Sequence, residues 1–245
     1  MQIDPEISKQ KISDLAKLKQ KKYRQEQRLV VVEGQRLIDQ LLSFGIKPVE
    51  FYYVERSPAG VAGIGSYELT PQQMQRICES ENPADLAGLF RLPEERRQKH
   101  KRALYLDRIS DPGNLGTIFR TAAAFGIEGI LLSADCCEIG SPKVIRASLG
   151  AVYKVPFHYA SPEDLSAEPA KLIAVDMGGS ISLSRYQPSP EAEIYILGSE
   201  AHGIDPELLG KADLTLRIEM AGKMESLNVA MSAAILCYHL SLGGS

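Results

Sequence analysis

Two patterns of apolar positions alternate along the first part of the chain. Runs rich in β-branched residues are typical of strands, whereas apolar residues three or four positions apart predict helices. The strands are predicted at 29–34 and 49–55, and the helices at 7–21 and 35–44. A further helix is predicted to start at Pro71 behind the capping residue Thr70, and a short strand is predicted to end at Leu92. This part of the chain is therefore expected to mix helices and strands.

After a basic stretch, short and almost wholly apolar runs alternate with helical segments. This pattern is typical of a parallel sheet that helices cover on both faces. The strands are predicted at 103–107, 129–133, 171–176, 194–199 and 214–218, and the helices at 111–126, at 142–148 and from about residue 227 onward. We therefore expect a smaller α/β domain over residues 1–92, a basic linker over 93–102 and a parallel-sheet α/β domain over 103–245.

The length of 245 residues favours two domains, and 44% hydrophobic with 24% charged residues is typical of a globular protein. The formal net charge of -3 does not by itself indicate a nucleic-acid partner. The charge is unevenly distributed, because residues 1–30 carry eight basic and four acidic side chains and a second basic run occupies 91–102. Each run fits either a solvated surface or contacts with nucleic-acid phosphates.

The sequence argues against several other classes of protein. The longest weakly polar stretch, 227–242, is interrupted by polar residues and is too short for a bilayer span, so no membrane segment is expected. Asp4 and Glu6 stand where a secretory signal would be basic and then apolar, so we expect a cytoplasmic protein. No cysteine has metal-ligand spacing, and reduced, buried thiols are expected. The cysteines are Cys78, Cys136, Cys137 and Cys237.

In a doubly wound sheet, ligands bind beyond the carboxyl ends of the strands, so the loops there are candidates for the site. The first loop leads from the strand at 103–107 into a helix, which Asp111 and Pro112 are well suited to start. The apolar stripe of this helix leaves Arg120 on its polar side, with Asn114 in or before the first turn. A capped helix with a solvated arginine would have the same sequence, so both interpretations stay open here.

Two later loops also join polar residues to apolar runs. Gly198 directly follows a buried strand, where a glycine lets a ligand approach the backbone. Glu200 and His202 alone are too few ligands for a zinc site, so no metal is expected. Ser226 is predicted to cap the last helix, which leaves Asn228 as a polar side chain at the start of a buried helix that needs a partner.

Three segments in these loops resemble the motifs of the SpoU family of RNA ribose 2′-O-methyltransferases, within the SPOUT superfamily. The segments are N-x-G-x-x-x-R at 114–120, L-G-x-E-x-x-G at 197–203 and S-L-N-V at 226–229. Three motifs in this order are far more specific than any one of them. The resemblance covers residues 104–240, and the first domain is similar to the L30e-like substrate-binding domain often fused in front. The chain differs from the family pattern at Glu219, where proline is usual.

The resemblance implies a parallel-sheet SPOUT fold with a trefoil knot at its carboxyl end, behind a smaller α/β domain. It also implies S-adenosyl-L-methionine as the cofactor, an RNA substrate (rRNA or tRNA), and a homodimer in which one subunit's arginine completes the other's site. By position, the residues implied to bind the cofactor are Val175, Gly198, Ile218 and Leu227. Those implied to surround the methyl group and the ribose are Asn114, Arg120, Glu200, Ser226 and Asn228.

The implied reaction is an in-line attack of a ribose 2′-hydroxyl on a methyl group, for which positioning can supply most of the acceleration and no metal is required. A guanidinium is effectively always protonated. We therefore expect Arg120 to clamp the target phosphate and stabilise developing negative charge, with Glu200 ordering the cluster.

Two alternatives belong to other functional classes. A catalytically inactive RNA-binding protein of the same fold is disfavoured by the intact set of polar residues. A dinucleotide-dependent oxidoreductase is disfavoured because no G-x-G-x-x-G follows a first strand.

Overall fold

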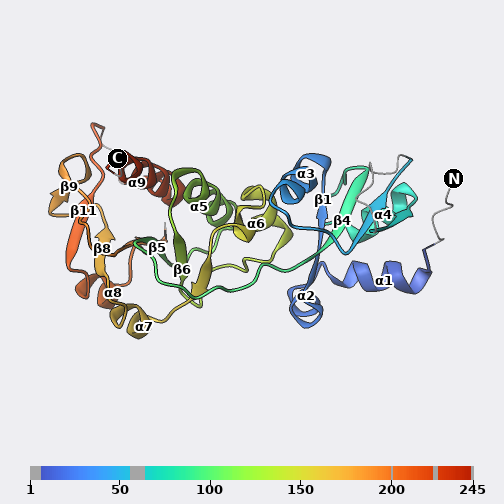
Figure 1. The fold of residues 1–245 in the computed structure, drawn as a ribbon, viewed down its shortest axis with the longest axis horizontal. Coiled ribbons are helices and arrows are strands. Elements are labelled where there is room, and N and C mark those ends of the chain that lie inside the picture. Colours follow the sequence, from blue (N-terminus) through green and yellow to red (C-terminus); the bar gives the residue numbers. More distant parts are fainter. Residues whose placement is uncertain (1–6, 56–63, 200, 223–225, 244–245) are drawn as a thin grey trace. The chain divides into compact units, whose positions relative to one another are not determined.

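A computed structural model describes residues 7–55, 64–199, 201–222 and 226–243. These residues form two compact units (Figure 1). The first unit contains the described residues up to Pro93 together with Gly140–Gly150, and the second contains Glu94–Ile139 and the described residues from Ala151 onward. The inclusion of Gly140–Gly150 in the first unit has no counterpart in the predicted division of the chain.

The first unit is built on a sheet of mixed strand direction. The strands are, in spatial order, β1 (Leu29–Glu33), β4 (Leu86–Arg91), β2 (Glu50–Tyr53) and β3 (Gly65–Glu68). β4 pairs antiparallel with both β1 and β2, whereas β2 and β3 are parallel. β3 was not predicted, because its residues are exposed or half-buried and so show no alternation of apolar and polar positions.

Five helices accompany this sheet in the described part of the first unit. They are α1 (Lys9–Lys17), α2 (Lys21–Gln27), α3 (Gln35–Ser43), α4 (Pro71–Ile77) and α6 (Pro142–Ala147). The helix predicted over 7–21 is present but shorter, because α1 ends at Lys17 and α2 begins at Lys21. The buried guanidinium of Arg24 donates there to the carbonyl oxygens of Leu18 and Lys19 at 2.8 and 2.7 Å, which satisfies groups that the helix end leaves unpaired.

The segment Gly140–Gly150 is packed tightly into the first unit. Its helix α6 lies against β1. A Cβ atom at Gly140 would stand 2.7 Å from the side chain of Leu92, and one at Gly150 would stand 2.7 Å from that of Leu41. Gly150 also has a φ of +78°, which favours glycine. Gly150 therefore favours glycine, whereas a side chain at Gly140 would need the end of Leu92 to move.

The second unit is built on a seven-stranded sheet in which every pairing is parallel, as predicted. In spatial order the strands are β7 (Phe157–Tyr159), β6 (Gly129–Leu132), β5 (Arg102–Asp107), β10 (Glu193–Gly198), β8 (Lys171–Val175), β11 (Leu214–Arg217) and β9 (Ile181–Ser182). The two edge strands, β7 and β9, were not predicted. β10 is inserted between β5 and β8, so the carboxyl ends of strands distant in sequence meet at one edge of the sheet.

Helices cover both faces of this sheet, with α5 (Pro112–Phe125) and α9 (Val229–Leu242) on one side and α7 (Pro162–Ser166) and α8 (Pro206–Gly210) on the other (Figure 1). Two short 3-10 helices, η1 (Ala151–Tyr153) and η2 (Leu183–Arg185), complete the unit. Asp111 caps α5 at its start, as predicted, and the helix ends at Gly126, which has a left-handed φ of 73°. Among the described helices, none is long and apolar enough to span a membrane.

Candidate functional site

A cavity lies beyond the carboxyl ends of β10, β8 and β11, next to the start of α9. The space between its walls, open solvent included, is about 620 Å³. Its walls are mainly apolar, with a small number of polar groups, which is typical of a site for a small organic molecule. The cavity therefore occupies the edge of the sheet at which a ligand is expected.

All four residues implied to bind the cofactor line this cavity: Val175, Gly198, Ile218 and Leu227. The loop after Gly198 folds back on itself, because the N–H of Gly203 donates to the carbonyl oxygen of Ser199 at 2.8 Å. A Cβ atom at Gly198 would stand 2.2 Å from the backbone of Gly203, so only glycine fits there. The cavity wall therefore consists of closely packed backbone in this region.

Asn114 and Asn228, which lie on different helices, meet at the site. The Nδ2 of Asn228 donates to the Oδ1 of Asn114 at 3.1 Å. The Oδ1 of Asn228 accepts from the N–H groups of Ala230 and Met231 at 2.9 and 3.3 Å, so Asn228 is the N-cap of α9. The expectation that Asn228 needs a partner is confirmed. The predicted cap at Ser226 is wrong, because α9 begins after Asn228, beyond the reach of the Ser226 side chain.

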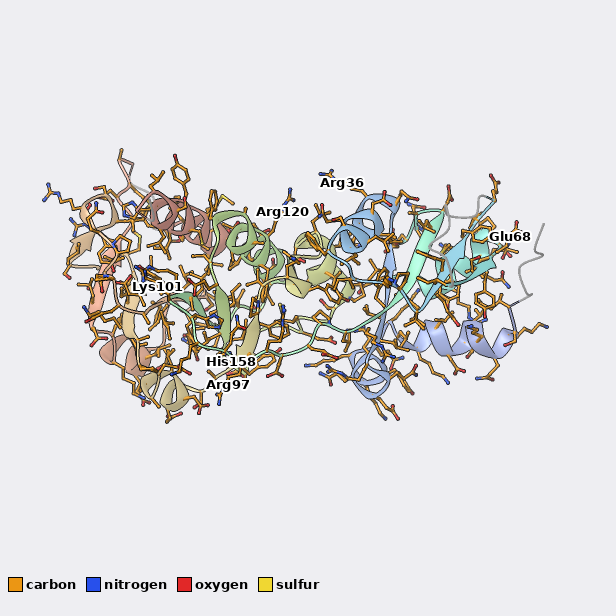
Figure 2. The ribbon with its side chains drawn as sticks, in the orientation of Figure 1. Arg36, Glu68, Arg97, Lys101, Arg120 and His158 are labelled. Atoms are coloured by element: carbon orange, nitrogen blue, oxygen red, sulfur yellow. The ribbon has the colours of Figure 1, made fainter. Side chains whose placement is uncertain are left out.

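The other residues implied to surround the ribose are placed less closely together. Arg120 lies on α5 about two turns beyond Asn114, where it is exposed and projects away from the sheet (Figure 2). Ser226 is also exposed and lines the cavity. Glu200 lies outside the described residues. Asn114 is thus hydrogen-bonded to Asn228, whereas Arg120, which is on α5 like Asn114, points outward.

Asp176 and Met220 are lining residues that sequence analysis did not single out. Asp176 ends the apolar run 171–176, and its Oδ1 accepts from the N–H of Gly178 at 2.8 Å. A carboxylate at the carboxyl end of a predicted parallel strand was a usable signal. Met220 had no such signal, because a methionine in a loop has no characteristic spacing.

Glu219, the departure from the family pattern, lies between the lining residues Ile218 and Met220. Its carboxylate accepts from the hydroxyl of Ser184 in η2 at 2.6 Å, and this hydrogen bond lowers the pKa of Glu219. Ser184 is itself hydrogen-bonded to Ser182 at 2.9 Å. The loop after β11 is therefore held to η2 by a side-chain hydrogen bond.

Asp107 and Arg108, at the carboxyl end of β5, form an ion pair that was also missed. The guanidinium of Arg108 donates to the buried carboxylate of Asp107 at 2.9 to 3.2 Å. That hydrogen bonding raises the pKa of Arg108. The same Asp107 carboxylate accepts from the N–H of Asp205 at 2.9 Å, so it also touches the loop that walls the cavity.

Neither a metal centre nor a disulfide is found in the part of the chain that the structure describes. His202 and the other candidate ligands there form no group that could hold a metal ion. Cys78, Cys136 and Cys237 are buried, as expected, whereas Cys137 is half-buried. Burial raises the pKa of Cys137 and Cys237 to about 12, so both stay protonated near neutral pH.

Comparison with known proteins follows the division into two units. Residues 101–238 match the model of the SpoU rRNA methylase family, and residues 9–88 match the model of the MRM3-like substrate binding domain. The first match covers more than half of the chain, so the chain belongs to the SpoU rRNA methylase family. The resemblance identified from the three motifs is confirmed.

Individual relatives agree over almost the whole chain. The chain is 34% identical to the 23S rRNA (guanosine(2553)-2′-O)-methyltransferase RlmP of Bacillus subtilis, over 94% of this chain and 96% of that protein. It is 25% identical to the 23S rRNA (uridine(2479)-2′-O)-methyltransferase of Streptomyces viridochromogenes, over 86% of this chain and 74% of that protein. The structure of the AdoMet-bound rRNA methyltransferase of Sinorhizobium meliloti superposes with a TM-score of 0.84 at 28% identity, covering 98% of each chain. These matches confirm the SPOUT architecture.

Proposed function

We propose that this protein transfers a methyl group from S-adenosyl-L-methionine to a ribose 2′-hydroxyl of structured RNA, with rRNA as the preferred substrate class. The observation that carries the proposal is the juxtaposition of the cavity with the Asn114–Asn228 pair at one edge of the sheet. Two of the relatives named above methylate 23S rRNA at 2′-oxygens according to their names, which favours rRNA over tRNA.

The lining of the cavity fits the proposed cofactor. Its apolar side chains, such as Val175, Ile218 and Leu227, suit a flat adenine ring, and the loop backbone offers amide and carbonyl groups for the polar parts. Asp176 and Ser226 supply polar side chains in the same cavity. When bound, S-adenosyl-L-methionine supplies an electrophilic methyl group on a positively charged sulfur.

The protein's own side chains would act on the RNA side of the reaction. The Asn228 side chain is held by the two N–H groups of α9 that it caps, and its Nδ2 in turn holds the Oδ1 of Asn114, so the pair presents fixed polar groups. Arg120 would bind the phosphate of the target nucleotide and stabilise negative charge as the hydroxyl oxygen attacks. The hydroxyl proton leaves to an acceptor other than Arg120, because the guanidinium carries its full complement of protons.

The first basic run offers a phosphate-binding surface, although some of its charges are paired. Lys11 forms an ion pair with Glu50 at 2.7 Å, and Lys17 pairs with Asp14 at 2.7 Å. The exposed lysines of α1 and α2 include Lys9, Lys21 and Lys22. We infer that these exposed lysines bind RNA, which should make affinity fall steeply with salt.

The second basic run is divided between structural and exposed residues. Arg96 donates to the carbonyl oxygens of Tyr153 and Lys154 at 3.0 and 3.1 Å, and Arg102 lies 3.5 Å from the buried carboxylate of Glu193. These two arginines therefore hold the second unit together. Arg97 and Lys99 are exposed and are the proposed RNA contacts of this run.

An apolar stripe on α9 supports the proposed homodimer. Met231, Ile235, Tyr238 and Leu242 recur at helical spacing, and their side chains are 50%, 41%, 54% and 61% exposed. A contiguous apolar helix face in water is typical of an interaction surface. Ile235→Glu should therefore shift the protein from dimer to monomer in sedimentation, whereas Val49→Glu, at the matched exposure of 41%, should leave the mass unchanged. A dimer in both variants would contradict the stripe as the interface.

The proposed activity is tested with the full chain, radiolabelled S-adenosyl-L-methionine and ribosomal RNA. Label should appear at a 2′-oxygen, and Arg120→Ala should lower the rate by orders of magnitude while keeping cofactor affinity. Arg76→Ala, an exposed arginine of α4 outside both basic runs, is the matched control. RNA binding without any methyl transfer would favour the inactive RNA-binding alternative. The trefoil knot and the cytoplasmic location stay predictions.

A further inference from the structure

Arg108 adopts a backbone conformation that arginine rarely takes. Its φ is +57°, in the left-handed region that favours glycine. The residue follows the last residue of β5 and precedes the loop that leads to Asp111, the cap of α5. A non-glycine residue in this region persists only where its surroundings hold it, so the contacts of the Arg108 side chain need an explanation.

The contacts of the Arg108 side chain join the end of β5 to the segment 203–205. The guanidinium donates to Asp107, lies 3.6 Å from the Oδ2 of Asp205 and lies 3.5 Å from the carbonyl oxygen of Gly203. Asp107 is only 4% exposed, and its carboxylate accepts from the N–H of Asp205. One charged pair therefore touches both ends of the segment 203–205.

This segment is a wall of the cavity. Gly203 and Ile204 line the cavity directly, and their backbone is the one that a Cβ atom at Gly198 would strike. The backbone of this segment packs directly against Gly198, so a displacement of 203–205 changes the shape of the cavity. Asp107 and Arg108 hold this segment through the N–H of Asp205 and the carbonyl oxygen of Gly203.

Arg108 is also fixed to the neighbouring loop by its backbone. Its N–H donates to the hydroxyl of Ser133 at 2.8 Å. The chain then continues into α5, which carries Asn114 and Arg120. Arg108 thus lies between the segment 203–205, which walls the cavity, and α5, the helix proposed to face the RNA.

We propose that Arg108 is a positioning residue that fastens the segment 203–205 to the end of β5 and so preforms the cofactor cavity. The inference rests on the proposed function, because it assigns the cavity to S-adenosyl-L-methionine. A glycine at this position would suit the backbone better, so the contacts of the arginine side chain must offset the cost of its left-handed conformation.

The test compares Arg108→Gly, Arg108→Lys and the wild type in the full chain. Arg108→Gly should weaken S-adenosyl-L-methionine binding about tenfold or more in calorimetry. It should also speed hydrogen exchange at the Asp205 amide, because the segment is held less firmly. Its thermal midpoint should stay within about 4 °C of the wild type, since glycine relieves the left-handed backbone. Arg108→Lys keeps the charge but loses the forked contact, so its affinity should lie between the two.

Glu55→Gly is the matched control, because Glu55 also has a left-handed φ, of 64°, is exposed, and belongs to the first unit. It should leave cofactor affinity unchanged. Wild-type affinity in Arg108→Gly, with the wild type itself binding, would overturn this inference alone. A wild type that binds no S-adenosyl-L-methionine would overturn the proposed function and the inference with it. If Arg108→Gly fails to fold, Arg108→Lys decides, and unchanged affinity in that variant would overturn the inference.

Discussion

Replacing Asn228 by aspartate should separate the two tasks of this side chain. Its Oδ1 caps α9, whereas its Nδ2 donates to Asn114. Aspartate keeps an oxygen for the cap and adds a negative charge at a helix N-terminus, which stabilises by about 0.3–1 kcal/mol. It removes the amide donor and places a carboxylate against the Oδ1 of Asn114. Asn228→Asp should therefore fold as well as the wild type and methylate RNA far more slowly.

The magnitudes follow from the contacts. Asn228→Ala loses the cap, at about 1 kcal/mol, and a partly exposed hydrogen bond worth at most about 1 kcal/mol more. For a chain of this size, at roughly 2 °C per kcal/mol, the loss lowers the thermal midpoint by about 2–4 °C. Asn228→Asp should show no such drop. Its kcat should fall by about 100-fold to 1000-fold, as expected when one pre-oriented donor is removed from a site.

The assay pairs thermal unfolding with single-turnover methyl transfer at saturating S-adenosyl-L-methionine. Asn82→Asp is the matched control, because Asn82 is exposed in the first unit and the same charge change there should alter neither reading. Wild-type turnover in Asn228→Asp would refute the role of the amide donor. A midpoint as low as that of Asn228→Ala would refute the role of the oxygen as the cap.

Three further variants test the site and the fold. Arg120→Lys should reduce turnover without moving the pH profile to lower pH. The pKa of lysine, about 10.4, is lower than that of arginine, which makes lysine the better base. An acid-shifted profile at near-wild-type turnover would therefore show that residue 120 acts as the base. Gly198→Ala should abolish cofactor binding in calorimetry, because its Cβ would stand 2.2 Å from the Gly203 backbone; retained affinity would contradict the close packing of that wall. Burial lowers the pKa of His158 below its ordinary 6.5. Above pH 6.5 the imidazole is neutral in both the folded and the unfolded chain, and its contribution to stability is complete. As the pH falls from 6.5 through the lowered pKa, the unfolded chain takes up the proton first, so this stability is lost. The thermal midpoint of His158→Gln should therefore decline less than that of the wild type between about pH 7 and pH 5, and equal declines would exclude His158 as the cause.

The elements that the sequence predicts well are those with local signals. α5 is an example, because Asp111, Pro112 and Gly126 mark its two ends within the segment itself. The strands of the second unit are also local, since a strand buried on both faces is apolar throughout. β3 has no such signal, and the break between α1 and α2 depends on the carbonyl contacts of Arg24, which a helical pattern does not reveal.

The site was predictable where a single residue sits at the end of a strand or at the start of a helix. Gly198 and Asn228 were found on that basis, and Asp176 had the same signal. The hydrogen bond between Asn114 and Asn228 joins residues that are 114 positions apart, so no local pattern predicts it. The left-handed conformation of Arg108 was hidden for another reason, because sequence rules expect glycine or asparagine there.

The membership of Gly140–Gly150 in the first unit has a consequence for synthesis on the ribosome. The chain leaves the first unit after Pro93 and returns only at Gly140, so a nascent chain that has reached Pro93 still lacks α6. Extending it to Gly150 takes roughly 3–11 s at usual elongation rates. During this interval β1 has no α6 against it, and the first unit cannot reach its final packing by folding vectorially from the amino terminus. Its completion must await residues synthesised after β5, α5 and β6 of its neighbour.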